Sequence, residues 1–154
     1  MATPKSVIKL KKNGVEYVSN VDKCQYYIFE LSRAALRDVA RFCVKEFRSS
    51  FYAIFQRHSG DAGKSTKYKV YSNKKTKYPR VEIGLKTGQV DGFYGYFQEV
   101  GSSKQPKLGL LTNVVQSNIP EIIKIESQYL SALEDEARAQ QLISEIEYEG
   151  DADG

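Results

Sequence analysis

Residues 22–56 have the sequence DKCQYYIFELSRAALRDVARFCVKEFRSSFYAIFQ, the strongest helical signal in this 154-residue chain. Apolar side chains recur in it mostly at steps of three or four, which places them on one face of a helix. The members of this apolar stripe are Cys24, Ile28, Leu31, Ala35, Val39, Phe42, Cys43, Phe47, Phe51 and Phe55. We therefore predict one long amphipathic helix that is capped by Asp22 and ends near Gln56. Because it would be roughly 50 Å long at about 1.5 Å per residue, it either bends near Ser49–Ser50 or projects beyond the sheet.

A basic stripe runs along the same predicted helix. Its members are Arg33, Arg37, Arg41, Lys45 and Arg48. Their steps of three or four keep them within about 120° of one another. Glu30 and Asp38 can each pair with an arginine three positions later, which offsets part of the repulsion. The basic stripe is either a surface for DNA phosphate or an acidic partner, or a solvated face of the helix.

Strands are predicted on both sides of this helix. Residues 7–20 contain Asn13–Gly14, a pair that tolerates the positive φ angles of a type I′ turn, so they form a β-hairpin. Residues 68–72 and 80–85 are also predicted as strands, and the second alternates cleanly between apolar and other side chains. The segment 59–63 before them has the composition of a turn.

The loop between these two strands is basic. Seven cations lie between Lys64 and Arg80, and Lys74, Lys75 and Lys77 stand in the loop itself. With the tyrosines among them they can follow a phosphate backbone. The alternative is that they keep an edge hairpin soluble.

An apolar helical pattern also runs from Leu110 towards the C-terminus. Pro120 interrupts it, so either the helix kinks there or Asn118 caps a new helix that has Pro120 in its first turn. Residues 148–154 are predicted to be a disordered acidic tail. Residues 1–147 are then a single α+β domain, in which a small antiparallel sheet is packed by a long N-terminal amphipathic helix and C-terminal helices.

Charge is strongly polarised along the chain, although the net charge is only +4. Residues 1–107 hold 21 of the 23 Lys and Arg, whereas residues 108–154 hold 10 of the 19 Asp and Glu. The acidic residues that we expect at an interface are Glu134, Asp135, Glu136, Glu145 and Glu147. The acidic C-terminal helix either meets a basic surface of another molecule or lies across the basic half of its own.

Nothing in the chain has the pattern of a catalytic, metal or cofactor site. His58 is the only histidine. Residues 60–65 have two positions between their glycines, whereas a P-loop needs four. Cys24 and Cys43 are predicted to be reduced core thiols, as is usual for a protein made in a reducing cytoplasm. No apolar run is long enough to span a membrane or to serve as an export signal.

Residues 91–110, with the sequence DGFYGYFQEVGSSKQPKLGL, join the two halves of the chain. The apolar spacing from residue 93 to residue 100 predicts two helical turns, with Asp91 as the N-cap and Gly101 just beyond the end. Glu99 has no carboxylate at a useful spacing with which to form a catalytic pair. We expect it to anchor the Gly-Ser-Ser turn at 101–103 through backbone N–H groups.

This order of residues resembles the hallmark of the phage neck and tail-completion family. In that family a Tyr-rich segment leads to Glu-aromatic-Gly-Thr-Ser and then to a Pro-Phe-Leu that opens the C-terminal helix. The residues that carry the resemblance are Tyr94, Tyr96, Phe97, Glu99, Gly101, Ser102, Ser103, Pro106 and Leu108. The likeness extends from about Leu31 to Leu133. The chain departs from the pattern in having Ser102 for the Thr and Lys107 for the Phe.

The resemblance implies a structural virion protein and not an enzyme. It would form a sixfold or twelvefold ring in the phage neck, assembled in the cytoplasm of the bacterial host, with no cofactor and no membrane contact. The ring would join the DNA-filled head to the tail, between a head-closure or adaptor protein and the tail tube or terminator, and surround the DNA channel. The acidic helix would then meet the basic stripe of an adjacent copy or of another neck protein. Deleting residues 134–154 should block joining of heads to tails while the monomer stays folded.

Two other functions are open. The chain can be a basic nucleic-acid-binding module that uses residues 64–80 and the basic stripe, and salt-sensitive DNA binding would distinguish it. It can also be a tail terminator of the same virion, which only its position in the particle would distinguish.

Overall fold

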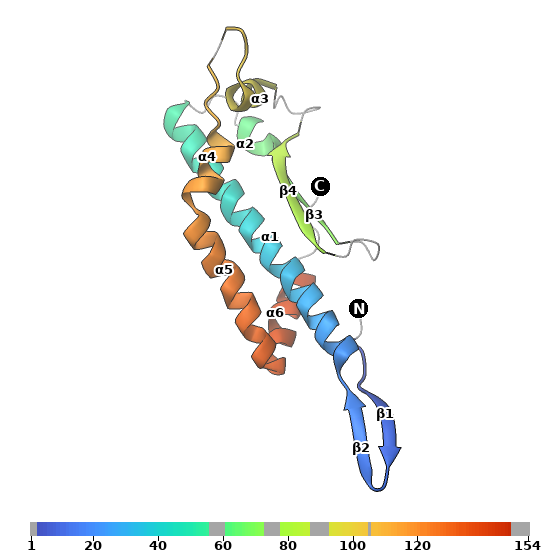
Figure 1. Ribbon diagram of the computed structural model, residues 1–154. Coiled ribbons are helices and arrows are strands. Elements are labelled where there is room, and N and C mark those ends of the chain that lie inside the picture. The colour runs from blue at the N-terminus through green and yellow to red at the C-terminus, as the bar shows by residue number, and fades with distance from the viewer. Residues whose placement is uncertain (1–2, 56–60, 73–77, 87–92, 105, 149–154) are drawn as a thin grey trace.

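The computed structural model describes residues 3–55, 61–72, 78–86, 93–104 and 106–148, and it has an α+β fold as predicted (Figure 1). A long helix, α1, is its axis, and every other helix follows it in the chain. The elements are β1 Val7–Lys12, β2 Val15–Ser19, α1 Val21–Ile54, α2 Asp61–Ser65, β3 Thr66–Tyr71, β4 Arg80–Leu85, α3 Phe93–Val100, α4 Leu110–Ser117, α5 Ile119–Ser131, the 3₁₀ turn η1 Ala132–Glu134 and α6 Glu136–Tyr148.

The long helix is confirmed, and its ends differ slightly from the prediction. Asn20 and not Asp22 is the N-cap, and Asp22 lies in the first turn, where the positive end of the helix favours a carboxylate. The helix ends at Ile54 with Phe55 as its C-cap and continues through Ser49–Ser50. A helix of this length was expected either to bend near Ser49–Ser50 or to project beyond the sheet. It projects, since the N-terminal end of α1 and the hairpin before it extend beyond β3–β4 (Figure 1).

The strands are divided between two separate antiparallel sheets, β1–β2 and β3–β4. The predicted turn of the first hairpin is confirmed, because Asn13 and Gly14 have φ angles of 52° and 79°. The second hairpin packs on α1, and β3 begins two residues before its predicted start. Residues 61–65 form the short helix α2, so the turn predicted over 59–63 is wrong from Asp61 onward, and its first two residues lie outside the described part of the chain.

The C-terminal region consists of three helices. At Pro120 the second alternative is confirmed: α4 ends at Ser117, Asn118 stands between the helices, and Pro120 lies in the first turn of α5. The sequence did not reveal a further break at η1, after which α6 returns along α1 (Figure 1). The Asp135 carboxylate caps the N-terminus of α6, since it accepts hydrogen bonds from the backbone N–H groups of residues 137 and 138 at 3.0 and 3.3 Å. Residues 149–154 of the predicted tail lie outside the described residues, and Tyr148 is the last residue of α6.

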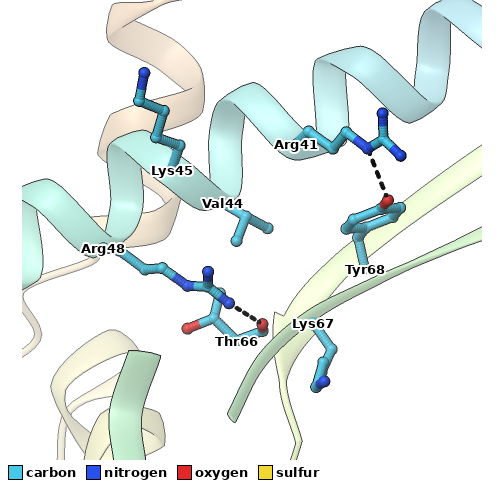
Figure 2. Close-up of a pocket in the computed structure, with 7 residues that line it drawn as sticks. All are labelled: Arg41, Val44, Lys45, Arg48, Thr66, Lys67 and Tyr68. Carbon is cyan, nitrogen blue, oxygen red and sulfur yellow. Dashed lines mark hydrogen bonds between the residues drawn. The ribbon is translucent and has the colours of Figure 1, made fainter. Parts of the chain in front are cut away.

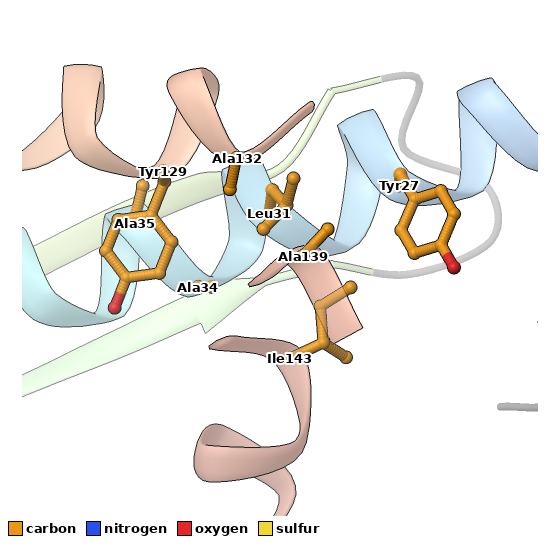
Figure 3. Close-up of a cluster of buried hydrophobic side chains, with 8 residues drawn as sticks. All are labelled: Tyr27, Leu31, Ala34, Ala35, Tyr129, Ala132, Ala139 and Ile143. Atoms are coloured by element: carbon orange, nitrogen blue, oxygen red, sulfur yellow. The ribbon is translucent and has the colours of Figure 1, made fainter. Parts of the chain in front are cut away.

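The main core lies where α1, α5, η1 and α6 meet (Figure 3). Its buried members are Tyr27, Leu31, Ala34, Ala35, Tyr129, Ala132, Ala139 and Ile143. The Tyr129 hydroxyl donates a hydrogen bond to the Asp38 carboxylate, and burial together with this bond raises the pKa of Tyr129. Because α6 supplies part of this core, deletion of residues 134–154 would open it. This truncation is therefore expected to destabilise the monomer and not to leave it folded, contrary to the expectation from the sequence.

The two cysteines differ in their environment. Both are free thiols, but Cys43 is buried as predicted, whereas the prediction of a core position is wrong for Cys24, which is exposed. Burial raises the pKa of the Cys43 thiol, which further lowers its reactivity. We expect a thiol reagent such as Ellman's reagent to label Cys24 in the native protein and Cys43 only after denaturation. The Cys24→Ser variant should then show no fast labelling, and fast labelling of that variant would contradict the buried position of Cys43.

Candidate functional site

Part of the basic stripe faces β3 across a pocket of about 360 Å³ (Figure 2). The pocket is lined by Arg41, Val44, Lys45, Arg48, Thr66, Lys67 and Tyr68. We call it the basic pocket. Four of these side chains are cations and none is a carboxylate, so the pocket is suited to an anionic group.

Two hydrogen bonds orient the arginines of the basic pocket. The Arg41 guanidinium donates from Nε to the Tyr68 hydroxyl at 3.4 Å, and Arg48 donates from Nη2 to the Thr66 carbonyl oxygen at 3.3 Å (Figure 2). Arg41 Nη1 also lies 3.7 Å from the Asp38 carboxylate. A planar guanidinium presents its N–H donors in a fixed fork, a geometry that matches the paired oxygens of phosphate or carboxylate.

The remaining predicted basic residues have other positions. Arg37 is buried, with only 8% of its surface exposed, so the interpretation of the whole stripe as a solvated face is wrong. Arg33 lies 3.4 Å from the Glu30 carboxylate, the neighbour that the spacing predicted. Lys67 of β3, which is not part of the basic stripe, lines the basic pocket together with Arg41, Lys45 and Arg48. Lys74, Lys75 and Lys77 lie outside the described residues.

The segment that resembles the neck family forms the junction between α3 and α4. Glu99, near the end of α3, accepts hydrogen bonds from the Leu111 N–H at 2.8 Å, the Thr112 N–H at 3.1 Å and the Thr112 hydroxyl at 2.7 Å. The expected role of Glu99 in the Gly-Ser-Ser turn is therefore wrong: it caps α4. The physical reason is that the first N–H groups of a helix lack partners within it, and Gly109 at the N-cap has no side chain to supply one.

Gly101 turns the chain back towards α3, as its predicted position beyond the helix requires. Its φ angle is 85°, and a Cβ at this position would lie 3.0 Å from the backbone nitrogen of Lys107. The Leu108 N–H then donates to the carbonyl oxygen of Gln98 at 2.9 Å, which closes the loop. A residue with a side chain at position 101 would be strained by both its backbone angle and this contact.

The other residues of this segment have less specific surroundings. The Tyr96 ring is half exposed and meets Phe97 edge to face at 5.8 Å between ring centroids. Ser102, Ser103 and Pro106 are exposed in the loop, and the Ser102 hydroxyl accepts a hydrogen bond from the Lys104 N–H. Tyr94 lies in the first turn of α3 and Asp91 lies outside the described residues.

Two of the predicted acidic interface residues act within the monomer. Asp135 caps α6, and Glu136 lies 2.7 Å from Lys23 Nζ and accepts a hydrogen bond from the Tyr27 hydroxyl. The intramolecular alternative is thus correct for Glu136, although its partner is Lys23 and not the basic stripe. Glu134 and Glu145 are exposed, and Glu147 lies in the last turn of α6.

The Lys23–Glu136 pair makes stability depend on pH. The hydrogen bond from Lys23 holds the pKa of Glu136 below its ordinary value of 4.5. Because the folded-state pKa is the lower one, this stabilisation is present above the unfolded-state pKa and is lost as the pH falls through the folded-state pKa. We expect Lys23→Met to reduce the loss of stability between about pH 7 and about pH 3, measured by urea unfolding. Lys86→Met, which removes an exposed cation after β4, should keep the wild-type difference. An equal reduction in both variants would contradict the assignment.

Within the described ranges, no group of His, Cys, Asp and Glu side chains could hold a metal ion. No helix in this part of the chain is both long enough and apolar enough to cross a membrane. His58 and Gly60 lie outside the described residues.

No family model, curated protein or solved structure matches the chain. The fold and the site together describe an α+β protein that is built on one long helix, α1. The basic pocket lies on one side of α1, and Glu99 of α3 caps the start of α4.

Proposed function

We propose that the protein is a structural component of a phage neck, a ring that joins the DNA-filled head to the tail and surrounds the DNA path. The observation that carries this proposal is the α3–α4 junction. The family hallmark places a Glu before a Gly-containing turn and a helix start, and in this chain Glu99 caps the helix that follows that turn. The capping role gives a physical reason for the order of residues on which the resemblance rests.

The exposed apolar surface supports an assembly protein over an enzyme. Large apolar side chains are between 40% and 71% exposed on the β1–β2 hairpin, on α5 and on η1. The residues concerned are Val7, Leu10, Val15, Tyr17, Val18, Ile119, Ile123, Leu130 and Leu133. Exposed apolar residues that gather on one face of an element are a common mark of protein–protein contact.

The charge distribution supports contacts between unlike surfaces. The basic pocket offers cations to a carboxylate-bearing neighbour, and Glu134 and Glu145 stand exposed on the acidic C-terminal region. Contacts between different surfaces of successive copies close into rings when the rotation between copies allows it. In the proposed neck, the basic pocket receives carboxylates of an adjacent copy or of the axial neighbour.

Inactivation of this gene in the phage that encodes it tests the proposal. We expect filled heads and free tails to accumulate, and the purified protein to restore joining in an extract of such cells. The variant Lys45→Glu should restore joining poorly, because Lys45 is an exposed cation of the basic pocket. Lys86→Glu, at an exposed position after β4 that does not line this pocket, serves as the charge-matched control. Complete infectious particles without the gene product would overturn the proposal.

The basic pocket also favours a second candidate, a nucleic-acid-binding module. Arg41 and Arg48 point towards β3, whereas the amino groups of Lys45 and Lys67 point away from the pocket (Figure 2). Cations spread in this way can meet successive phosphates, and such binding weakens steeply with salt. Sub-micromolar binding to duplex DNA in a gel shift, lost on adding salt and in Lys45→Glu but not in Lys124→Glu, would favour this module. A neck protein that lets DNA pass should not bind it tightly. A tail terminator, the third candidate, differs from a neck ring in its position in the particle.

A further inference from the structure

One face of the β1–β2 hairpin is apolar and exposed. Residues paired across an antiparallel ladder lie on the same face, and Leu10 pairs with Tyr17, Lys12 with Val15 and Val7 with Ser19. The apolar members of this face, which we call the hairpin face, are Val7, Leu10, Val15 and Tyr17, with 45%, 68%, 71% and 57% of their surface exposed. An isolated two-stranded hairpin is only marginally stable in water, so packing of this face against another protein surface would stabilise the hairpin.

The position of the hairpin makes it accessible to another molecule. It extends from the N-terminal end of α1, away from the helices that surround the core (Figure 1). Its opposite face carries Val18 and the ion pair between Lys11 and Glu16. Among the described side chains of the hairpin, the exposed apolar ones are therefore concentrated on the hairpin face, with Val18 alone among them on the other.

A second exposed apolar surface runs along α5. Ile119, Ile123 and Leu130 are 49%, 55% and 50% exposed, and at about 100° per residue they lie within roughly 40° of one another. Leu133 of η1, 40% exposed, follows them along the chain. We call these four residues the α5 stripe. It is distinct from the side of α5 that packs on α1, where Tyr129 is buried.

The α5 stripe leads into an apolar pocket of about 270 Å³. The pocket is lined by Leu31, Ser32, Ala35, Leu36, Tyr78, Pro79, Glu126, Tyr129 and Leu130. A cavity of about 150 Å³ is enough to hold a benzene ring, so this pocket can accept an aromatic side chain. Leu130 belongs to both the stripe and the pocket, so the two adjoin at this residue.

The two surfaces also differ in charge. The segment 5–19 that contains the hairpin carries four lysines and one glutamate, whereas residues 119–134 carry three glutamates and one lysine. Glu126 lies at the edge of the apolar pocket. Opposite charge around two apolar surfaces favours their association and disfavours pairing of each surface with itself.

We propose that the hairpin face of one copy packs on the α5 stripe of the next copy, with Tyr17 entering the pocket beside Leu130. This inference rests on the proposed function, because it names the contact through which a ring would close. The two surfaces are different parts of the chain, so the contact is heterologous and repeats from copy to copy.

Cross-linking between two single-cysteine preparations tests the contact. Both carry Cys24→Ser; one adds Leu10→Cys and the other Ile123→Cys, and a short bismaleimide reagent is applied to each and to their mixture. We expect a cross-linked dimer in the mixture and neither preparation to cross-link alone. A chain with both substitutions should give a ladder of oligomers. Val18→Cys and Gln128→Cys, on the other face of the hairpin and the other exposed flank of α5, are the matched controls and should not cross-link.

Charge substitutions give an independent test. Leu10→Asp and Ile123→Asp should each weaken self-association at least about tenfold, measured by analytical ultracentrifugation, whereas Val18→Asp and Gln128→Asp should not. All four positions are exposed, so circular dichroism should be unchanged. A ring that forms normally with Leu10→Asp, or cross-links between hairpins only, would overturn this contact and leave the proposed ring intact. A wild-type chain that stays monomeric at every concentration would overturn both.

Discussion

Leu31→Ala is expected to lower the free energy of unfolding by about 2–5 kcal/mol. Leu31 has no exposed surface and lies at the centre of the core formed by α1, α5, η1 and α6 (Figure 3). Several of the core residues around it are alanines, whose side chains cannot move to fill the space that the substitution leaves. The loss of stability should therefore contain most of the free-energy cost of an unfilled cavity, in addition to the free energy lost with the buried methyl groups of Leu31.

Urea unfolding followed by circular dichroism measures this effect. Ile28→Ala is the matched control, because Ile28 lies one turn earlier on α1 and is 48% exposed. It should change the free energy of unfolding by less than about 1 kcal/mol. Equal losses in the two variants would contradict the packing of α5 and α6 on this part of α1.

Glu99→Ala is expected to cost about 1.5–3 kcal/mol of stability. The half-buried carboxylate accepts three hydrogen bonds at the start of α4, and two of the donors are backbone N–H groups that no residue of α4 can satisfy. Glu99→Gln should cost less, because its amide keeps one oxygen acceptor but directs an NH₂ group at donors. Glu121→Ala removes an exposed carboxylate that pairs with Lys124 and should cost at most about 1 kcal/mol.

Amide hydrogen exchange distinguishes capping from a general loss of stability. We expect the N–H groups of Leu111 and Thr112 to exchange faster in Glu99→Ala, beyond the change seen in the core of α1. Unchanged protection of these two amides would contradict the capping role of Glu99.

The elements that the sequence predicted well are those with local signals. The apolar spacing of 22–56 was enough for α1, and Asn13–Gly14 was enough for the first hairpin. The chain reversal at η1 depends instead on tertiary packing, where Ala132 and Ala139 let the helices approach closely. A signal was nevertheless present, since Asp135 is a favourable N-cap residue.

The candidate site was predictable only in part. Spacing placed the arginines and Lys45 on one side of α1, but it could not indicate that β3 would face part of that side or that Arg37 would be buried. The cap by Glu99 was missed because its acceptor oxygens and the N–H groups are twelve or more residues apart in the chain. A glycine at the start of a helix, such as Gly109, was the one local sign that a distant side chain must supply the cap.

The most direct test of the proposed neck ring is native mass spectrometry of the full chain over a range of protein concentrations. We expect one closed species of six or twelve copies, which Leu10→Asp dissociates and Val18→Asp leaves intact. A wild-type chain that remains monomeric at every concentration, or that forms an open-ended series of oligomers with no preferred size, would contradict a ring.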